Sequence, residues 1–268
     1  MLGSDDSNGR ALFALGGAVH AGGTYATRLY PLFTITGTAF DTHAPRANAW
    51  AILGAAEVLK ARPDDAVAKD LLYRCLPRLG TTRLNPVWPW PEDRLAYDNA
   101  RLPQARIAAG RALGDVDLVD EGLALLTWLT NVETTGGHFS FTPHTGWAHG
   151  EPRPGFDQQP IEGGSMADAC SEAFAATGDP RWAELTQLAA EWFFGNNDTG
   201  ALLFDAETGG GRDGLESDGC NENQGAESTL AVITALQAAR RSQAALRSAA
   251  STVSVSSTAA PVQRSAAP

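Results

Sequence analysis

The feature of this sequence that most constrains its fold is a repeated helix start, in which Gly-Asp is followed at a fixed distance by Trp. Residues 114–128 read GDVDLVDEGLALLTW and residues 178–192 read GDPRWAELTQLAAEW, and a looser copy, ARPDDAVAKDLLYRCL, begins at Ala61. Gly suits the left-handed position that closes one helix, and the Asp side chain accepts backbone N–H bonds at the start of the next. The repeat therefore predicts pairs of helices joined by tight turns.

The connections between the predicted helices alternate between short and long. Short links force antiparallel neighbours, whereas the long segments 80–97, 132–158 and 195–221 are rich in Pro, Gly, Trp, Asp and Asn. Loops of that length in a compact domain are usually functional. The pattern predicts about nine helices, with the three long loops on one rim. Besides the repeated segments, helices are expected over 6–19, 26–39, 48–61, 99–113, 161–177 and 223–240.

Helical hairpins stacked side by side either extend as a solenoid or close into a ring. The first helix of each pair is rich in Gly and Ala, as expected for inner helices near a ring axis. We therefore predict an all-α protein with an (α/α) toroid over residues 1–241. A closed ring of six hairpins needs about twelve helices, so we expect an incomplete ring or a missing neighbouring segment. Residues 242–268 consist mainly of Ser, Ala, Thr, Val and Pro, which predicts a disordered tail.

Composition excludes several classes of partner. The net charge of −11 argues against nucleic acid and anionic membranes, since both need a basic patch. Neither a signal peptide nor an apolar run of about 20 residues is present, so a cytoplasmic protein is expected. Cys75, Cys170 and Cys220 match neither a disulfide framework nor a zinc spacing, and the first two are expected to be buried thiols. We expect neither a metal nor a cofactor.

The long loops combine Trp with carboxylates and amides, which is the chemistry of a sugar site. Glycosidic cleavage needs two carboxyl groups across the scissile bond. A general acid is expected from Glu92 or Asp93, because the neighbouring Trp residues would raise the pKa of such a carboxyl. A base is expected from Asp157 or Glu227, near helix starts that stabilise an anion. The alternatives are an Asp93–Arg94 surface pair, a capping Asp157 and a merely dipole-favoured Glu227.

The remaining candidates are expected to bind substrate. Asp98 has a capping role as its alternative, Glu162 a capping-box role, and Trp128 and Trp192 are expected in the core. The histidines on the loop 132–158 are not spaced as a metal pair. The predicted substrate-binding residues are Trp88, Trp90, Arg94, Tyr97, Asp98, Asn99, His144, Trp147, Gln158, Gln159, Glu162, Asn223 and Gln224.

Several motifs carry a resemblance to a known family. LAYDNARLPQA, FDQQPIE, TGD-x-x-W with WFFGNND, DGL and NQGAESTL, spread over residues 4–239, resemble bacterial helical-toroid proteins similar to six-hairpin glycosidases. Members are often encoded beside, or fused behind, a glycosyltransferase domain. The resemblance implies a toroid, a carbohydrate ligand, a glycosyltransferase partner and, for a hydrolase, inversion. Relatives carry a further N-terminal helical segment with its own Asp-Asp-Asn-Ala-Arg stretch, whereas this chain starts later.

The sequence thus predicts a carbohydrate-active toroid of the glycoside hydrolase type, with an inverting two-carboxylate mechanism acting on an oligosaccharide. One alternative is a sugar epimerase that uses His144 or His149 for proton transfer. Another is a non-catalytic glycan-binding or scaffold domain that serves a glycosyltransferase.

Overall fold

The computed structural model describes residues 4–257, with side chains for residues 4–248, and its helices form two layers. Each hairpin places one helix in an inner layer and its partner in an outer layer, and each inner helix packs against the next inner helix. The inner helices are α1 (Asp5–Ala21), α3 (Pro45–Ala61), α5 (Arg101–Leu113), α7 (Pro160–Thr177) and α9 (Ala226–Ser257); the outer ones are α2 (Gly23–Ala39), α4 (Ala66–Cys75), α6 (Val116–Val132) and α8 (Pro180–Glu191).

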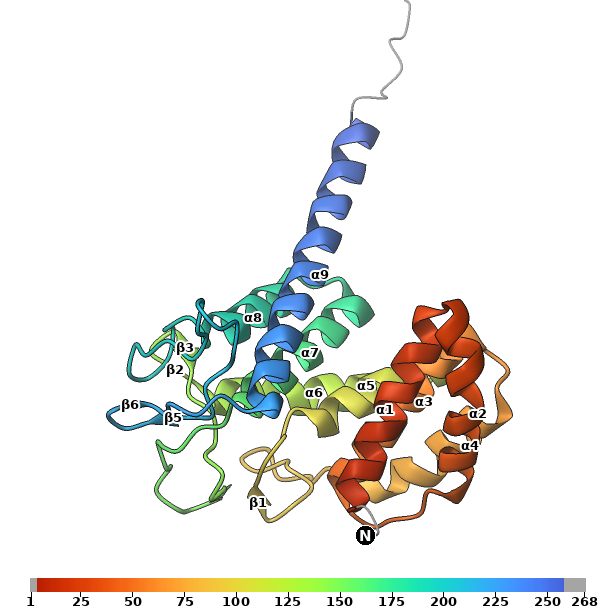
Figure 1. Cartoon of the computed structure of the whole chain (residues 1–268), viewed down its shortest axis with the longest axis horizontal. Helices are drawn as coiled ribbons and strands as arrows, with labels where there is room; N and C mark the ends of the chain where they lie inside the picture. Colours follow the sequence, from red (N-terminus) through yellow and green to blue (C-terminus); the bar gives the residue numbers. More distant parts are fainter. Residues whose placement is uncertain (1–3, 258–268) are drawn as a thin grey trace, which may run out of the picture.

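This arrangement confirms the predicted all-α toroid, and within the described residues the ring is an open arc (Figure 1). Helices α1 and α9 stand at the two ends of the arc. Their first halves are joined by an ion pair, in which Arg10 Nη1 lies 3.0 Å from an oxygen of Glu227. Their later parts diverge, as Figure 1 shows.

The repeated helix starts have the predicted geometry. Gly114 and Gly178 both adopt left-handed backbone conformations, with φ of 70°. Each following Asp caps its helix: a carboxylate oxygen of Asp115 lies 3.0 Å from a backbone nitrogen three residues on, and one of Asp179 lies 3.0 Å from the nitrogen two residues on. The looser copy behaves alike, because Asp65 accepts a 2.9 Å bond from the start of α4.

Small residues allow the inner helices to touch backbone to backbone. A Cβ atom placed on Gly16 of α1 would lie only 2.1 Å from the carbonyl oxygen of Gly54 in α3. A real Cβ does not fit there, so the two glycines set the spacing of these helices. The Gly and Ala of the first helix in each pair thus mark the inner layer, as predicted.

The three long loops lie on one rim, as predicted. Arg94 and Leu95 of one loop pair with residues of the next, and Gln158 of that loop bridges to Leu215 of the third. All three gather at the lower left of Figure 1. The 3₁₀ helix η1 (Leu76–Leu79) follows α4 just before the first loop, and the loops carry the short strands β1 (Arg94–Leu95), β2 (Thr134–Thr135), β3 (His138–Phe139), β4 (Trp147–Ala148), β5 (Leu215–Glu216) and β6 (Gly219–Cys220). Strand β1 pairs with β4, β2 with β3, and β5 with β6, all antiparallel.

The structure differs from the predicted boundary at residue 242, because α9 continues through it to Ser257. Ser242 is buried and its hydroxyl lies 3.3 Å from that of Ser171, while the Gln243 amide donates a 2.7 Å bond to Gln187. The segment is rich in Ala, the strongest helix former. The turn of α9 that holds Ser242 and Gln243 also packs against α7 and α8. The rest of the predicted tail, residues 258–268, lies outside the described residues.

Cys75 and Cys170 are buried free thiols, as predicted. Burial raises the pKa of Cys75 to about 11 and raises the pKa of Cys170 further still. Within the described part of the chain, no helix combines the length and the apolar character that crossing a membrane requires.

Candidate functional site

The inner helices all begin at the rim that carries the long loops, so their first turns bring polar side chains together. Arg46, in the first turn of α3, is buried and holds the turn that precedes α5. Its Nε donates a 2.9 Å bond to the Tyr97 carbonyl, and its Nη2 donates a 3.0 Å bond to the Asn99 side chain. Its Nη1 pairs with Glu92. One arginine thus connects the inner helix α3 to the loop that leads into the inner helix α5.

Asp98, at the centre of this turn, combines three unusual properties. It is fully buried, and neither carboxyl oxygen has a well-formed hydrogen bond from a described residue, although the nearby Ser165 hydroxyl acts on the carboxyl. The nearest charged atom is Arg101 Nε, 3.5 Å away. Its backbone φ is 53°, the only positive value outside Gly in the described residues. Such unpaired groups and strained backbones cluster at functional sites.

Burial raises the pKa of Asp98, against the opposing effect of Arg101, Arg10 and Arg46. The group therefore keeps its proton to a higher pH than an ordinary carboxyl, which is what a general acid needs. Its alternative role as a helix cap is excluded, because the residue that caps α5 is Ala100 and the helix begins at Arg101.

Glu162 of α7 fixes the backbone of this turn. Its carboxylate accepts bonds from the backbone N–H groups of Asp98 and Asn99, the second at 3.1 Å. It does not form a capping box, since it bonds the turn before α5 instead. Burial raises the pKa of Glu162 well above its usual range, and the nearby carboxyls of Glu133 and Asp98 raise it further. Glu162 therefore holds the backbone of the turn that carries Asp98.

A second group of charges borders Asp98 at the open ends of the arc. Arg10 of α1 bonds Asp6 at 2.7 Å and Glu227 of α9 at 3.0 Å. The Tyr97 hydroxyl donates a 3.1 Å bond to Asp6, and burial raises the pKa of Tyr97 to about 12. The Glu227 side chain is 61% exposed. A buried acid and an exposed carboxylate therefore both interact with Arg10.

The predicted sugar platform of Trp88 and Trp90 is contradicted by their burial. They are 3% and 0% exposed. The ring centroid of Trp128 lies 5.2 Å from that of Trp88 and 5.9 Å from that of Trp90, and Trp147 lies 5.4 Å from Trp88. The loop folds back onto α6, whose Trp128 covers both rings. Trp192 is a core residue, as predicted.

The four predicted catalytic carboxyls separate into two pairs. Glu92 and Glu227 join the networks around Arg46 and Arg10. Asp93 is 97% exposed and pairs with Arg83 rather than Arg94, at 2.6 Å. The side chain of Asp157 is exposed and bonds no described residue, and it does not cap α7, because that helix begins at Pro160 after Gln159. Only the first pair bonds arginines whose charges also act on Asp98, namely Arg46 and Arg10.

Most of the other predicted binding residues have structural roles. Gln158 is buried and accepts bonds from the Phe141 N–H at 2.9 Å and from the Trp192 indole at 3.2 Å. The Gln224 amide donates a 2.9 Å bond to Asp205.

The others lie at the edges of the loops. Arg94 pairs with Glu151 at 3.1 Å, and the carbonyl of Asn223 accepts a 2.9 Å bond from the backbone of the same loop region. His144 is exposed, and Trp147 is partly exposed.

Sequence reasoning did not select Asp6, Arg10, Arg46 and Glu133. A usable signal is the lone arginine near the start of an inner helix otherwise rich in Ala and Gly, because such a charge needs partners from neighbouring helices. Glu133 is buried at the end of α6, where its carboxylate accepts a 3.0 Å bond from the Thr142 N–H, and burial raises its pKa. No group of three or more metal-ligand side chains gathers in the described residues.

The raised pKa values predict how stability depends on pH. Asp98, Glu133 and Glu162 hold protons more tightly when folded. Their contribution is complete below about pH 4, where the unfolded carboxyls are also protonated, and is lost as pH rises through the raised folded values. From about pH 5 to about pH 8 the free energy of unfolding should fall less in Glu162→Gln than in the natural protein. Urea denaturation at both pH values gives the free energy of unfolding. An equal fall from about pH 5 to about pH 8 in Glu162→Gln and in the natural protein would contradict the prediction.

The described residues thus define the class of this protein as an all-helical α/α toroid. No protein-family model and no curated protein matches the chain. A solved structure that is similar is the crystal structure of an unsaturated glucuronyl hydrolase specific for heparin, at 10% sequence identity and a TM-score of 0.49. The match covers 70% of this chain and 57% of that one, so this chain spans little more than half of that protein. Similarity at this level assigns neither an activity nor a site to this chain.

Proposed function

We propose that this toroid is a carbohydrate-active enzyme of the glycoside hydrolase type, whose site lies where the inner helices begin. The observation that supports this most strongly is the state of Asp98. It is a fully buried carboxyl with a raised pKa, and its oxygens have no well-formed hydrogen bond from a described residue, the Ser165 hydroxyl being the nearby donor that lowers the pKa against burial. Strongly perturbed acids in such surroundings are typical of catalytic centres. The sugar chemistry itself rests on the loop composition and on the sequence resemblance.

Asp98 replaces Glu92 and Asp93 as the proposed general acid, and Glu227 is the proposed base. Glu92 is bound by Arg46, and Asp93 lies in solvent. Glu227 is exposed in the first turn of α9, where it pairs with Arg10 at 3.0 Å. In the inverting mechanism, Asp98 gives its proton to the glycosidic oxygen while Glu227 takes a proton from the attacking water. Because Asp98 is fully buried, this step requires that sugar binding uncover its side chain. Arg46 and Glu162 hold the Asp98 turn in place.

The other expectations remain proposals from the sequence. They are a glycosyltransferase partner, a cytoplasmic location, and the alternatives of an epimerase or a scaffold domain. His149 lies 5.8 Å from the Trp88 ring and His144 is exposed, and neither contacts the Asp98 network in the described residues. That placement favours the carboxylate mechanism over the epimerase.

Turnover of a panel of oligosaccharides, followed by proton NMR of the released anomer, tests this function. We expect a product of inverted configuration. Glu227→Gln should lower kcat by about 10²–10⁴-fold. Asp157→Asn is the matched control, since its exposed side chain bonds no described residue, and it should leave kcat unchanged. Loss of turnover in Asp157→Asn but not in Glu227→Gln would reverse the assignment. Binding without turnover of any glycan would favour the scaffold.

A further inference from the structure

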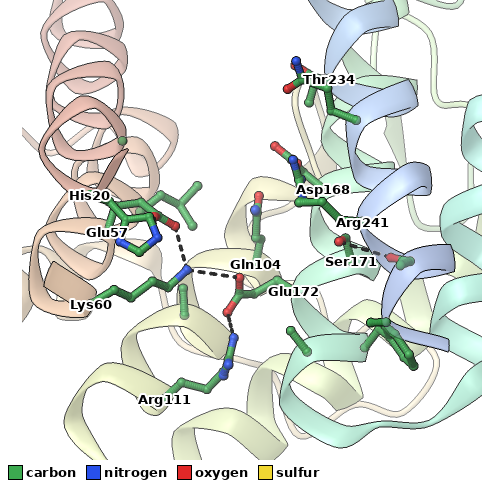
Figure 2. A pocket seen from close by; sticks show the side chains of 18 of the residues that line it. His20, Glu57, Lys60, Gln104, Arg111, Asp168, Ser171, Glu172, Thr234 and Arg241 are labelled. Atoms are coloured by element: carbon green, nitrogen blue, oxygen red, sulfur yellow. Dashed lines mark hydrogen bonds and ion pairs between the residues drawn. The ribbon is translucent and has the colours of Figure 1, made fainter. Parts of the chain in front are cut away.

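A hollow of about 860 Å³ lies inside the arc, away from the Asp98 site. All five inner helices line it with their middle and later turns, including His20 of α1, Lys60 of α3 and Arg111 of α5. The lining does not include Asp98 or Glu227. Figure 2 shows side chains from both sides of the arc facing a common space. The size is within the usual range for small-molecule sites.

Three basic residues of this hollow, His20, Lys60 and Arg111, sit in the last turns of their helices, where the dipole favours positive charge. Carboxylates from the same helix and from another inner helix pair with Lys60 and Arg111. Lys60 Nζ lies 2.7 Å from an oxygen of Glu57 and 3.9 Å from one of Glu172, and Glu172 also pairs with Arg111. Figure 2 shows this row of alternating charges across three inner helices.

In a second cluster on the wall, one carboxylate bonds two arginines, and over the whole lining three cations are matched by three carboxylates. Asp168 accepts a 3.0 Å bond from Arg101 and a 3.1 Å bond from Arg241. Gln104 is buried, its Oε1 accepts a 2.6 Å bond from Arg101, and its amide N–H groups have no acceptor among the described residues. The wall therefore presents fixed hydrogen-bond donors and fixed hydrogen-bond acceptors. Neither positive nor negative charge is in excess.

We propose that this hollow is a second binding site, for a neutral oligosaccharide. An anion would face the carboxylates of Asp168 and Glu172, and a polyamine would face the cations of Lys60 and Arg111. A hydroxyl group both donates and accepts, so a neutral sugar satisfies such a mixed wall without an unpaired charge. The partly buried ring of Phe13 also lines the hollow and suits the apolar C–H face of a sugar. The proposal rests on this cavity and not on catalysis at Asp98.

Gly17 provides a clean test, because a Cβ added there meets nothing within 4 Å while the residue lines the hollow. A side chain at this helical position also avoids the helix cost of Gly, so Gly17→Trp should fold. Calorimetric titration with maltotriose, cellotriose and mannotriose should show binding of at least one. Gly17→Trp should weaken it by about tenfold or more. Glu172→Gln, which removes one acceptor charge, should weaken it as well.

The Asp98→Asn variant removes the proposed turnover but not sugar binding at the rim, so the hollow is isolated by comparing Asp98→Asn with and without Gly17→Trp. Binding that persists in Asp98→Asn and is lost in Gly17→Trp would support the second site even if no glycan is turned over. The proposal is overturned if none of the three sugars binds or if Gly17→Trp leaves binding unchanged. It is equally overturned if inorganic phosphate or spermidine binds more tightly than the sugars and is blocked by Gly17→Trp.

Discussion

Asp98→Asn is expected to reduce kcat by about 10²–10⁴-fold while leaving the fold and sugar binding intact. The substitution keeps the shape of the side chain and removes the proton that the proposed mechanism transfers. Because the carboxyl is buried with a raised pKa, a neutral amide should be tolerated in its place. The measurement is kcat across pH, together with the melting temperature and the sugar affinity of the variant.

Asp93→Asn is the control for this prediction, because Asp93 is an exposed carboxyl on the neighbouring loop. It should leave kcat and its pH profile unchanged. If Asp98→Asn keeps kcat within a few-fold of the natural protein, Asp98 is not the acid, and the proposed mechanism fails with it.

Arg46→Met should lower the free energy of unfolding by about 2–4 kcal/mol, which is somewhat less than for a fully buried ion pair because Glu92 is partly exposed. The arginine is buried and bonds the Tyr97 carbonyl, the Asn99 side chain and Glu92. Methionine has a similar length but leaves all three partners without their donor. The expected loss corresponds to a melting temperature about 5–15 °C lower, as measured by calorimetry.

Arg83→Met is the matched control for Arg46→Met. Arg83 pairs with the exposed Asp93, and such a surface pair contributes at most about 1 kcal/mol. A loss of equal size in the two variants would show that the Arg46 network does not organise this rim. Arg46→Met should also lower turnover, since it releases the turn that carries Asp98.

The fold could be predicted because its signals are local. Asp115 and Asp179 cap helices through neighbours two or three residues away, and each Gly before them closes a helix by its own φ. All the atoms that interact at these helix ends therefore lie within a few residues of one another in the sequence. The alternation of short and long connections then leaves few ways to pack the hairpins.

The site could be predicted only in part because its signals are long-range. The loop composition predicts a site on the rim, which stays a prediction, but Trp88 and Trp90 are covered by Trp128, a residue about forty positions away. The state of Asp98 depends on Glu162, which lies in a different hairpin.

The central claim is that sugar binds on the rim where the inner helices begin, next to Asp98 and Glu227. A crystal of the Asp98→Asn variant soaked with mixed oligosaccharides tests it most directly. The account predicts a sugar ring in contact with the side chain at position 98 and with Glu227, with a water held by Glu227 on the opposite face of the anomeric carbon. Sugar bound only around Asp157, or only in the hollow lined by Lys60 and Glu172, would contradict it.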